Sequence, residues 1–178
     1  MTASAAASEV RIRRALAEDR LPIARMLELY QYELSDIWDQ DLDLHGEYGY
    51  ALDRYWQDPA CRPYIVGVAG HPAGFALVDA ALKVGHTGCW MDQFFILKKY
   101  RRRGLGRALA WHVFDALPGP WEVGQMAANT AAQRFWRRLI ADYSGGHYTE
   151  HSLAAGWWQG QVQCFNSAAR PPAPASAG

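Results

Sequence analysis

The segment best suited to chemistry is a basic, glycine-containing turn at residues 96–108, ILKKYRRRGLGRA. A hydrophobic strand is predicted to end at Leu97, and apolar residues repeating every four positions from Leu105 predict a helix. The first turn of a helix has unpaired backbone N–H groups and the positive end of the helix dipole, so it can hold an anion. Gly104 and Gly106 let that anion approach the backbone closely. The segment therefore predicts a pyrophosphate-binding loop.

Two well-known phosphate-binding loops do not fit this segment. A Walker loop requires GxxxxGK[ST], and the chain has no Gly-Lys-[Ser/Thr]. A dinucleotide fingerprint requires GxGxxG/A, and Leu109 stands where the third small residue belongs. A third kind of loop therefore has to be considered.

Two motifs resemble those of the GNAT superfamily of N-acetyltransferases. Residues 101–106, RRRGLG, are similar to its [Q/R]xxGxG/A acetyl-CoA motif, and residues 129–136, NTAAQRFW, resemble its NxxAxx[L/F]Y segment. The runs FFILKKYRRRGLG and PGPWEV resemble a group of bacterial proteins predicted to be acetyltransferases. The resemblance covers roughly residues 9–165, and its specific motifs lie within 90–109 and 129–136.

The resemblance implies that acetyl-CoA is the cosubstrate and that no metal is needed. The backbone amides of residues 102–107 would hold the pyrophosphate, with Arg side chains reaching the phosphates. The backbone of residues 95–97 would pair with the pantetheine arm like an added strand. Asn129 would contact that arm or cap its own helix. The implied cofactor-binding residues are Phe95, Ile96, Leu97, Arg101, Arg102, Arg103, Gly104, Leu105, Gly106, Arg107, Asn129 and Trp136.

The implied reaction is direct attack of a neutral amine on a thioester in a ternary complex. It needs a base for the ammonium proton, hydrogen-bond donors for the oxyanion and an acid for the thiolate. Asp92 is the preferred base because relatives often carry the base on that strand, and Glu122 is the carboxylate on the next strand. Trp136 stands where many relatives have a Tyr acid, and indole is no proton source at neutral pH. Tyr143 and Tyr148 are the alternative acids.

Charge is strongly segregated along a chain whose net charge is zero. Residues 28–58 hold nine acidic residues and one basic residue, a net charge of about −8, whereas residues 98–107 hold six basic residues and no acid. In GNAT folds the first two helices and their linking loop cover the acceptor site, so an acidic cover would attract a cationic amine. We therefore expect a small basic or polyamine-like acceptor. The predicted acceptor-binding residues are Asp36, Asp39 and Tyr48, within a cover that also holds Asp41, Asp43, Tyr50 and Trp56, and Gln93, which stands beside Asp92 on the strand before the basic loop.

Other interpretations stay open at this point. The domain could bind acyl-CoA as a sensor or scaffold with altered chemistry, which Trp136 favours, whereas Asp92 and the complete loop favour an enzyme. A nucleic-acid-binding protein using the basic loop would show steeply salt-dependent affinity. Asp92 could equally be a hydrogen-bonded strand carboxylate. His147-x3-His151 has helical metal-ligand spacing but no evident third ligand, so no metal site is expected.

Composition favours one soluble, cytoplasmic domain. The chain has 178 residues, of which 50% are hydrophobic, which excludes global disorder and fits a single core. No stretch approaches the ~18 apolar residues of a membrane span, and no signal peptide is recognisable. The 3 cysteines form no CxxC pair, which argues against a disulfide framework or a zinc site. We expect no nucleic-acid or membrane partner. One of Trp157 and Trp158 is expected to line the acceptor pocket or a homodimer contact.

The predicted fold class is α+β: a GNAT-like mixed, mostly antiparallel sheet of six to seven strands with flanking helices. The resemblance adds a splayed central strand pair. The domain is predicted at 9–166, between disordered tails at 1–8 and 167–178. Strands are predicted at 9–15, 62–69, 74–82, 88–97, 121–128 and 157–165. Helices are predicted at 19–34, 47–57, 105–117 and 130–141, with a loop at 35–45 and a hairpin turn at 70–73.

Overall fold

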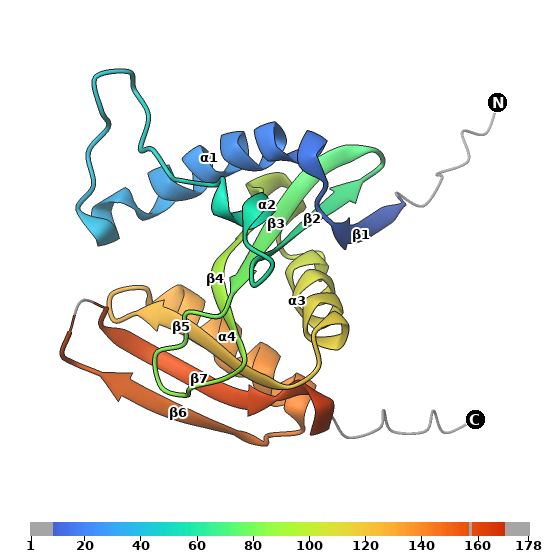
Figure 1. The fold of residues 1–178 in the computed structure, drawn as a ribbon, viewed down its shortest axis with the longest axis vertical. Helices are drawn as coiled ribbons and strands as arrows, with labels where there is room; N and C mark the ends of the chain where they lie inside the picture. Colours follow the sequence, from blue (N-terminus) through green and yellow to red (C-terminus); the bar gives the residue numbers. More distant parts are fainter. Residues whose placement is uncertain (1–8, 157, 170–178) are drawn as a thin grey trace. The chain divides into compact units, whose positions relative to one another are not determined.

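The computed structural model describes residues 9–156 and 158–169 (Figure 1). The predicted tail at 1–8, most of the predicted tail at 167–178, and Trp157 lie outside these residues. The chain divides into two compact units. The first runs to Asp79 and includes Asp92–Val113, and the second comprises Ala80–Met91 and the chain from Phe114 onward. Strand β4 (Cys89–Ile96) and helix α3 (Leu105–Ala116) contribute residues to both.

The first unit contains an antiparallel sheet whose strands are β1 (Val10–Arg14), β2 (Arg62–Val68), β3 (His71–Asp79) and the second half of β4 (Cys89–Ile96). The N–H of Leu97 donates to the carbonyl of Ala73 at 2.9 Å, which continues the ladder between β3 and β4. Ala69 and Gly70 both have positive φ, 50° and 79°, as a tight two-residue hairpin requires. The turn predicted at 70–73 is therefore wrong: the chain reverses earlier and β3 begins at His71.

Two helices of the first unit differ from the prediction. Helix α1 (Arg20–Trp38), preceded by the 3-10 turn η1 (Ala17–Asp19), continues through Ser35, where a loop was predicted. It ends because Asp39 adopts the left-handed conformation, with φ 49°. Helix α2 (Arg54–Gln57) has one turn, so the helix predicted at 47–57 is wrong over its first seven residues.

The core of the first unit lies between α1 and the sheet (Figure 1). Ile23 and Leu27 of α1 are fully buried against Phe75 of β3 and Phe95 of β4. The rings of Phe75 and Phe95 lie 5.9 Å apart, and Tyr30 contacts both. Burying each such side chain stabilises the fold by about 1.5–3 kcal/mol. This packing holds β4 and α1 in place, and both elements carry site residues.

The second unit joins the first half of β4 to β5 (Pro120–Met126), β7 (Gly160–Asn166) and β6 (Tyr148–Leu153), with α4 (Thr130–Ser144) alongside. Strands β4 and β5 run parallel, and their register covers only Cys89–Met91 against Trp121–Val123. Strand β6 was not predicted, because most of its side chains are exposed and show no apolar face. Phe114, at the end of α3, lies 4.9 Å from Trp121, 5.1 Å from Tyr143 and 4.9 Å from Phe165 by ring centroid, forming the centre of this unit's core.

Hydrogen-bonded neighbours place the strands in the order β1-β2-β3-β4-β5-β7-β6. The sheet is mixed and mostly antiparallel, with β4 and β5 as the parallel pair, which confirms the predicted α+β class. Ser167 begins the last 3-10 turn, η3 (Ser167–Ala169); it is buried, and its hydroxyl accepts from the N–H of Gly119 at 3.1 Å. Across residues 9–156 and 158–169, no helix combines the length and apolarity needed to cross a membrane.

Candidate active site

The basic loop after β4 has the backbone shape of an anion-binding turn. It passes through the 3-10 turn η2 (Lys98–Tyr100), and then Arg102 and Gly104 adopt left-handed conformations, with φ 62° and 77°. Such conformations gather backbone N–H groups into a concave arrangement. The N–H of Ala108 donates to the carbonyl of Gly104 at 3.0 Å, the first bond of α3, so the N–H groups just before it have no intrahelical acceptor. A Cβ added at Gly104 would meet nothing within 4 Å, so the turn is open for a ligand.

Arg101 holds this loop onto the first unit. Its Nε donates to the carbonyl of Ile96 at 2.6 Å, and its Nη2 donates to the Glu33 carboxylate at 2.7 Å. Its guanidinium also lies 5.2 Å from the ring centre of Phe95. The side chain thereby joins the loop to β4 and α1. Arg102 and Arg103, by contrast, are exposed.

The backbone of β4 divides its hydrogen bonds between two sides. Leu97 donates its N–H to Ala73 of β3, and Ile96 offers its carbonyl to Arg101. The backbone carbonyl of Phe95 points toward β3, because its oxygen lies 2.3 Å from the position that a Cβ on Gly74 would take. Alternation along a strand therefore points the N–H of Ile96 to the opposite side from β3. Of the three residues predicted to pair with a pantetheine arm, Ile96 has the suitable orientation.

Asp92 lies at the centre of a polar cluster in the first unit. Its Oδ2 accepts a hydrogen bond from the Tyr55 hydroxyl at 2.5 Å, one from Arg54 at 3.0 Å, and a short one from the Tyr50 hydroxyl. All three donors meet the same carboxylate oxygen. The cluster therefore fixes the orientation of the Asp92 carboxylate, leaving Oδ1 as its second acceptor atom.

Arg54 joins two carboxylates in this cluster. Its Nη1 lies 2.9 Å from Oδ2 of Asp79, and its Nη2 reaches Asp92. Asp79 is 4% exposed, so its charge needs such a partner. One guanidinium and two carboxylates give the cluster a formal charge of −1, which a cationic ligand would complement. Arg54 is the single basic residue of the acidic segment 28–58, a signal from which its role could have been foreseen.

The two tyrosines of the cluster are hydrogen-bond donors. Burial, and then the neighbouring Asp92 charge, raise the pKa of Tyr50 and of Tyr55 above the usual range. Both hydroxyls thus keep their protons at neutral pH and hold Asp92 from two sides. The amide of Gln93 lies 3.5 Å from the Tyr50 hydroxyl oxygen, so Gln93 and Asp92 approach the same group. Tyr55, Arg54 and Asp79 were not predicted as partners of Asp92.

The acidic segment between α1 and α2 is fastened at its base. The Glu28 carboxylate accepts the N–H of Tyr48 at 2.8 Å and that of Gly49 at 3.4 Å, and the amide of Gln40 donates to the carbonyl of Tyr48 at 2.9 Å. These bonds explain why the segment does not become helical. Asp36 and Asp39, at the end of α1, are exposed, and no hydrogen bond among the described residues links them to Asp92.

In the second unit, Glu122 anchors a loop. Glu122 is 4% exposed, and its carboxylate accepts the N–H groups of Lys83 at 2.7 Å, of Val84 at 3.1 Å and of Gly85 at 2.5 Å. Three backbone donors occupy both oxygens of this carboxylate. The structure thus gives Glu122 a role in positioning the loop of residues 83–85. The donors to Asp92 among the described residues, by contrast, all meet its Oδ2.

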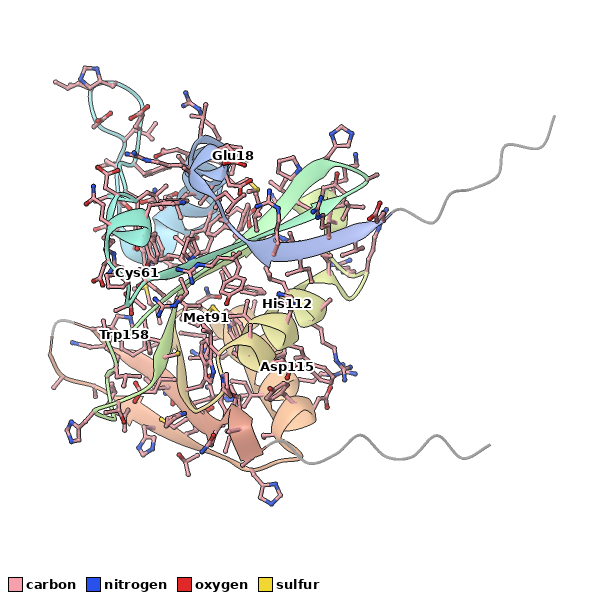
Figure 2. The ribbon with its side chains drawn as sticks, turned by 45° about the vertical axis from the view of Figure 1, so that its right-hand side comes forward. Glu18, Cys61, Met91, His112, Asp115 and Trp158 are labelled. Carbon is pink, nitrogen blue, oxygen red and sulfur yellow. The ribbon has the colours of Figure 1, made fainter. Side chains whose placement is uncertain are left out.

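The remaining predicted residues lie on or next to α4. Asn129 accepts the N–H of Ala132 at 3.1 Å, which confirms the helix-capping alternative. Tyr143 is 1% exposed, and its hydroxyl donates to Asp115 at 2.7 Å (Figure 2 labels Asp115). Trp136 is 5% exposed and lies 6.4 Å from the Phe114 ring. In the part of the chain that the structure describes, no group of three or more His, Cys, Asp and Glu side chains is placed to hold a metal ion.

Comparisons with known proteins identify the family and the fold. Residues 24–140 match the model of the acetyltransferase (GNAT) family. An acetyltransferase from Thermus thermophilus aligns with a TM-score of 0.65 and 13% identity over 90% of this chain and 98% of its own. The Vibrio cholerae spermidine N-acetyltransferase, solved with CoA and spermine, aligns with a TM-score of 0.60 and 13% identity over 89% of this chain and 95% of its own. The Escherichia coli ribosomal-protein-S18-alanine N-acetyltransferase aligns with a TM-score of 0.58 and 16% identity over 96% of this chain and 99% of its own. No match to a curated protein was found by sequence.

Proposed function

Since the chain belongs to the acetyltransferase (GNAT) family, we propose that it transfers an acetyl group from acetyl-CoA to a primary amine of a small cationic acceptor. The observation that carries the proposal is the Asp92 cluster, which combines an oriented carboxylate with a formal charge of −1. A cationic amine complements that charge, and a carboxylate can take its proton. Of the three structures compared, one is named as a spermidine N-acetyltransferase and another as a ribosomal-protein-S18-alanine N-acetyltransferase, and both names describe transfer to an amine.

The loop after β4 would hold the cofactor. The concave backbone of residues 102–104 and the first turn of α3 present N–H groups suited to a pyrophosphate, and exposed Arg102 and Arg103 add positive charge. The N–H of Ile96 would pair with the pantetheine arm. When bound, acetyl-CoA supplies a thioester whose carbonyl carbon forms a C–N bond with the amine as its C–S bond breaks and CoA leaves.

Asp92 would act as the base. An ammonium must lose one proton before its nitrogen can attack, and Oδ1 of Asp92 is the acceptor atom that the cluster leaves available. Tyr50, Tyr55 and Arg54 keep the carboxylate in one orientation, which reduces the entropy lost on proton transfer. Glu122 would position the loop of residues 83–85 rather than exchange protons. Asp36, Asp39 and Tyr48 would attract and line the approach of the acceptor.

The alternative proposal is an acyl-CoA-binding sensor. Two observations favour it: Trp136, which stands where relatives have a Tyr acid, is buried, and the hydroxyl of the candidate acid Tyr143 donates to Asp115. Neither residue offers a proton to a leaving thiolate in this arrangement. Solvent, or Tyr148, would have to supply that proton in an active enzyme.

The experiment that separates the two proposals has two stages in one sample. The protein is titrated calorimetrically with acetyl-CoA and with CoA, and thiol release is then followed with spermidine, putrescine, a singly charged alkylamine and an uncharged aromatic amine. We expect acetyl-CoA and CoA to bind, and thiol release to increase with the positive charge of the acceptor. Binding without release on any amine would support the sensor, and failure of both cofactors to bind would overturn the assignment of the basic loop.

A further inference from the structure

Helix α1 carries an exposed apolar stripe on the side opposite the core. The helix packs on the sheet of the first unit through residues such as Ile23 and Leu27 (Figure 1). On its outer side, Leu21 is 63% exposed, Leu29 51% and Tyr32 67%. At about 100° per residue, these three side chains lie within about 80° of arc around the helix axis. They therefore form one stripe along the outer face of α1.

Two charged residues belong to the same stripe. Arg25 and Asp36 are exposed and lie within the same arc, one toward each end of the helix. Neither has a hydrogen-bond or ion-pair partner among the described residues. The acids beside the stripe are already engaged, Glu28 with backbone N–H groups of the acidic segment and Glu33 with the basic loop. Arg25 and Asp36 are thus available to a partner.

The order of these residues makes the stripe self-complementary. Arg25 and Asp36 lie equally far from the midpoint between residues 30 and 31, and so do Leu29 and Tyr32. A second copy of α1 laid antiparallel across this midpoint puts Arg25 opposite Asp36 and Leu29 opposite Tyr32, and two-fold symmetry makes each contact twice. Opposite charges then flank an apolar centre. A parallel pair would instead put each charge against its own copy, so the pattern selects the antiparallel arrangement.

We propose that the protein forms a homodimer through its α1 helices, packed antiparallel about a two-fold axis. A single helix pair buries less than the ~1,200 Å² of a stable interface, so the dimer is reversible, with a Kd on the order of micromolar. This inference goes beyond the proposed function and does not depend on it. Because Asp36 is also proposed to attract the acceptor, the tests measure association and not activity.

The first test is whether the full chain associates. Sedimentation equilibrium between about 5 and 500 µM covers the range of a small, reversible interface and should show a monomer–dimer equilibrium. Leu29→Gln removes the apolar centre and should leave a monomer throughout this range. Leu29 is exposed in the monomer, so Tm measured at low concentration should not change. A native chain that stays monomeric at every concentration would overturn the proposal.

Charge reversal then tests the pairing. Arg25→Glu and Asp36→Arg each convert both charge pairs of the dimer into repulsions, so each variant should associate roughly ten-fold or more weakly than the native chain. The matched control is Arg138→Glu, which makes the same change of charge at an exposed position of α4 and should dimerise like the native chain. Dimerisation that neither reversal weakens, or that the control weakens equally, would refute an interface on α1.

Mixing the two reversed variants gives the decisive result. In a mixed pair, the acid introduced at position 25 faces the base introduced at position 36, and native Asp36 faces native Arg25. Fluorescently labelled Arg25→Glu should therefore associate with Asp36→Arg at close to the native affinity, which also shows that both variants are folded. If mixing restores nothing, the antiparallel pairing is wrong. Because neither acetyl-CoA nor an amine is present, failure of the dimer and failure of the proposed function are distinguishable.

Discussion

Replacing Asp92 by Asn tests the chemical assignment most directly, because the change removes the charge and keeps the shape. The amide oxygen can still accept hydrogen bonds from the hydroxyls of Tyr50 and Tyr55. Arg54 keeps its ion pair with Asp79, in which Nη1 lies 2.9 Å from Oδ2. The Arg54 side chain is 43% exposed, so losing its pairing with Asp92 should cost less than about 1 kcal/mol of stability. For a chain of this size, that lowers Tm by about 2–4 °C at most.

The catalytic effect should be much larger than the structural one. A general base accelerates a reaction roughly 10²- to 10⁴-fold, so kcat of Asp92→Asn is expected to fall by that factor, or about 3–5 kcal/mol of barrier. The assay is thiol release at saturating acetyl-CoA and polyamine, with CoA affinity measured by calorimetry and Tm by circular dichroism. Asp53→Asn, which removes an exposed carboxylate paired with Arg20, is the matched control and should keep wild-type kcat.

A specific result would refute this reasoning. If kcat of Asp92→Asn falls less than about three-fold while CoA affinity and Tm are unchanged, the carboxylate takes no proton and serves only to order the cluster. If Tm falls by more than about 10 °C, the cluster is chiefly structural, and the base has to be sought elsewhere.

Three further predictions concern the loop anchor, the cofactor loop and a pH-dependent ion pair. Glu122→Gln leaves one oxygen for three backbone donors, so the free energy of unfolding should fall by about 1–3 kcal/mol in denaturant titrations; wild-type stability with lost activity would instead mark Glu122 as a chemical group. Gly104→Ala should cost about 1–2 kcal/mol and weaken CoA binding, whereas Gly46→Ala, with the same φ of 77° in equally open space, should cost as much and leave CoA affinity unchanged. The Arg13 hydrogen bonds lower the pKa of Asp19 below its usual range, so folding favours the ionised carboxylate. The stability that this ion pair contributes is present above about pH 4 and is lost as the pH falls. Asp19→Asn should reduce this pH dependence in denaturation curves measured from pH 7 to pH 3.

The sequence by itself determined the parts of the protein that are local in the chain. The loop of residues 98–104 and the start of α3 follow one another directly, so the glycines, the basic residues and the helix period predicted their arrangement without tertiary contacts. The same holds for α4, whose cap Asn129 and amphipathic repeat lie within one segment. These two segments also carried the family resemblance.

Tertiary structure decided which side chains surround Asp92. Its partners come from residues 50–55, about forty positions earlier, and Arg54 reaches on to Asp79 of β3. No periodicity reports such long-range pairs, because their geometry depends on how the helix layer packs on the sheet. The short α2 and the exposed β6 were missed for related reasons: backbone bonds to Glu28 override helix propensity before α2, and pairing with β7 forms a strand that has no apolar face.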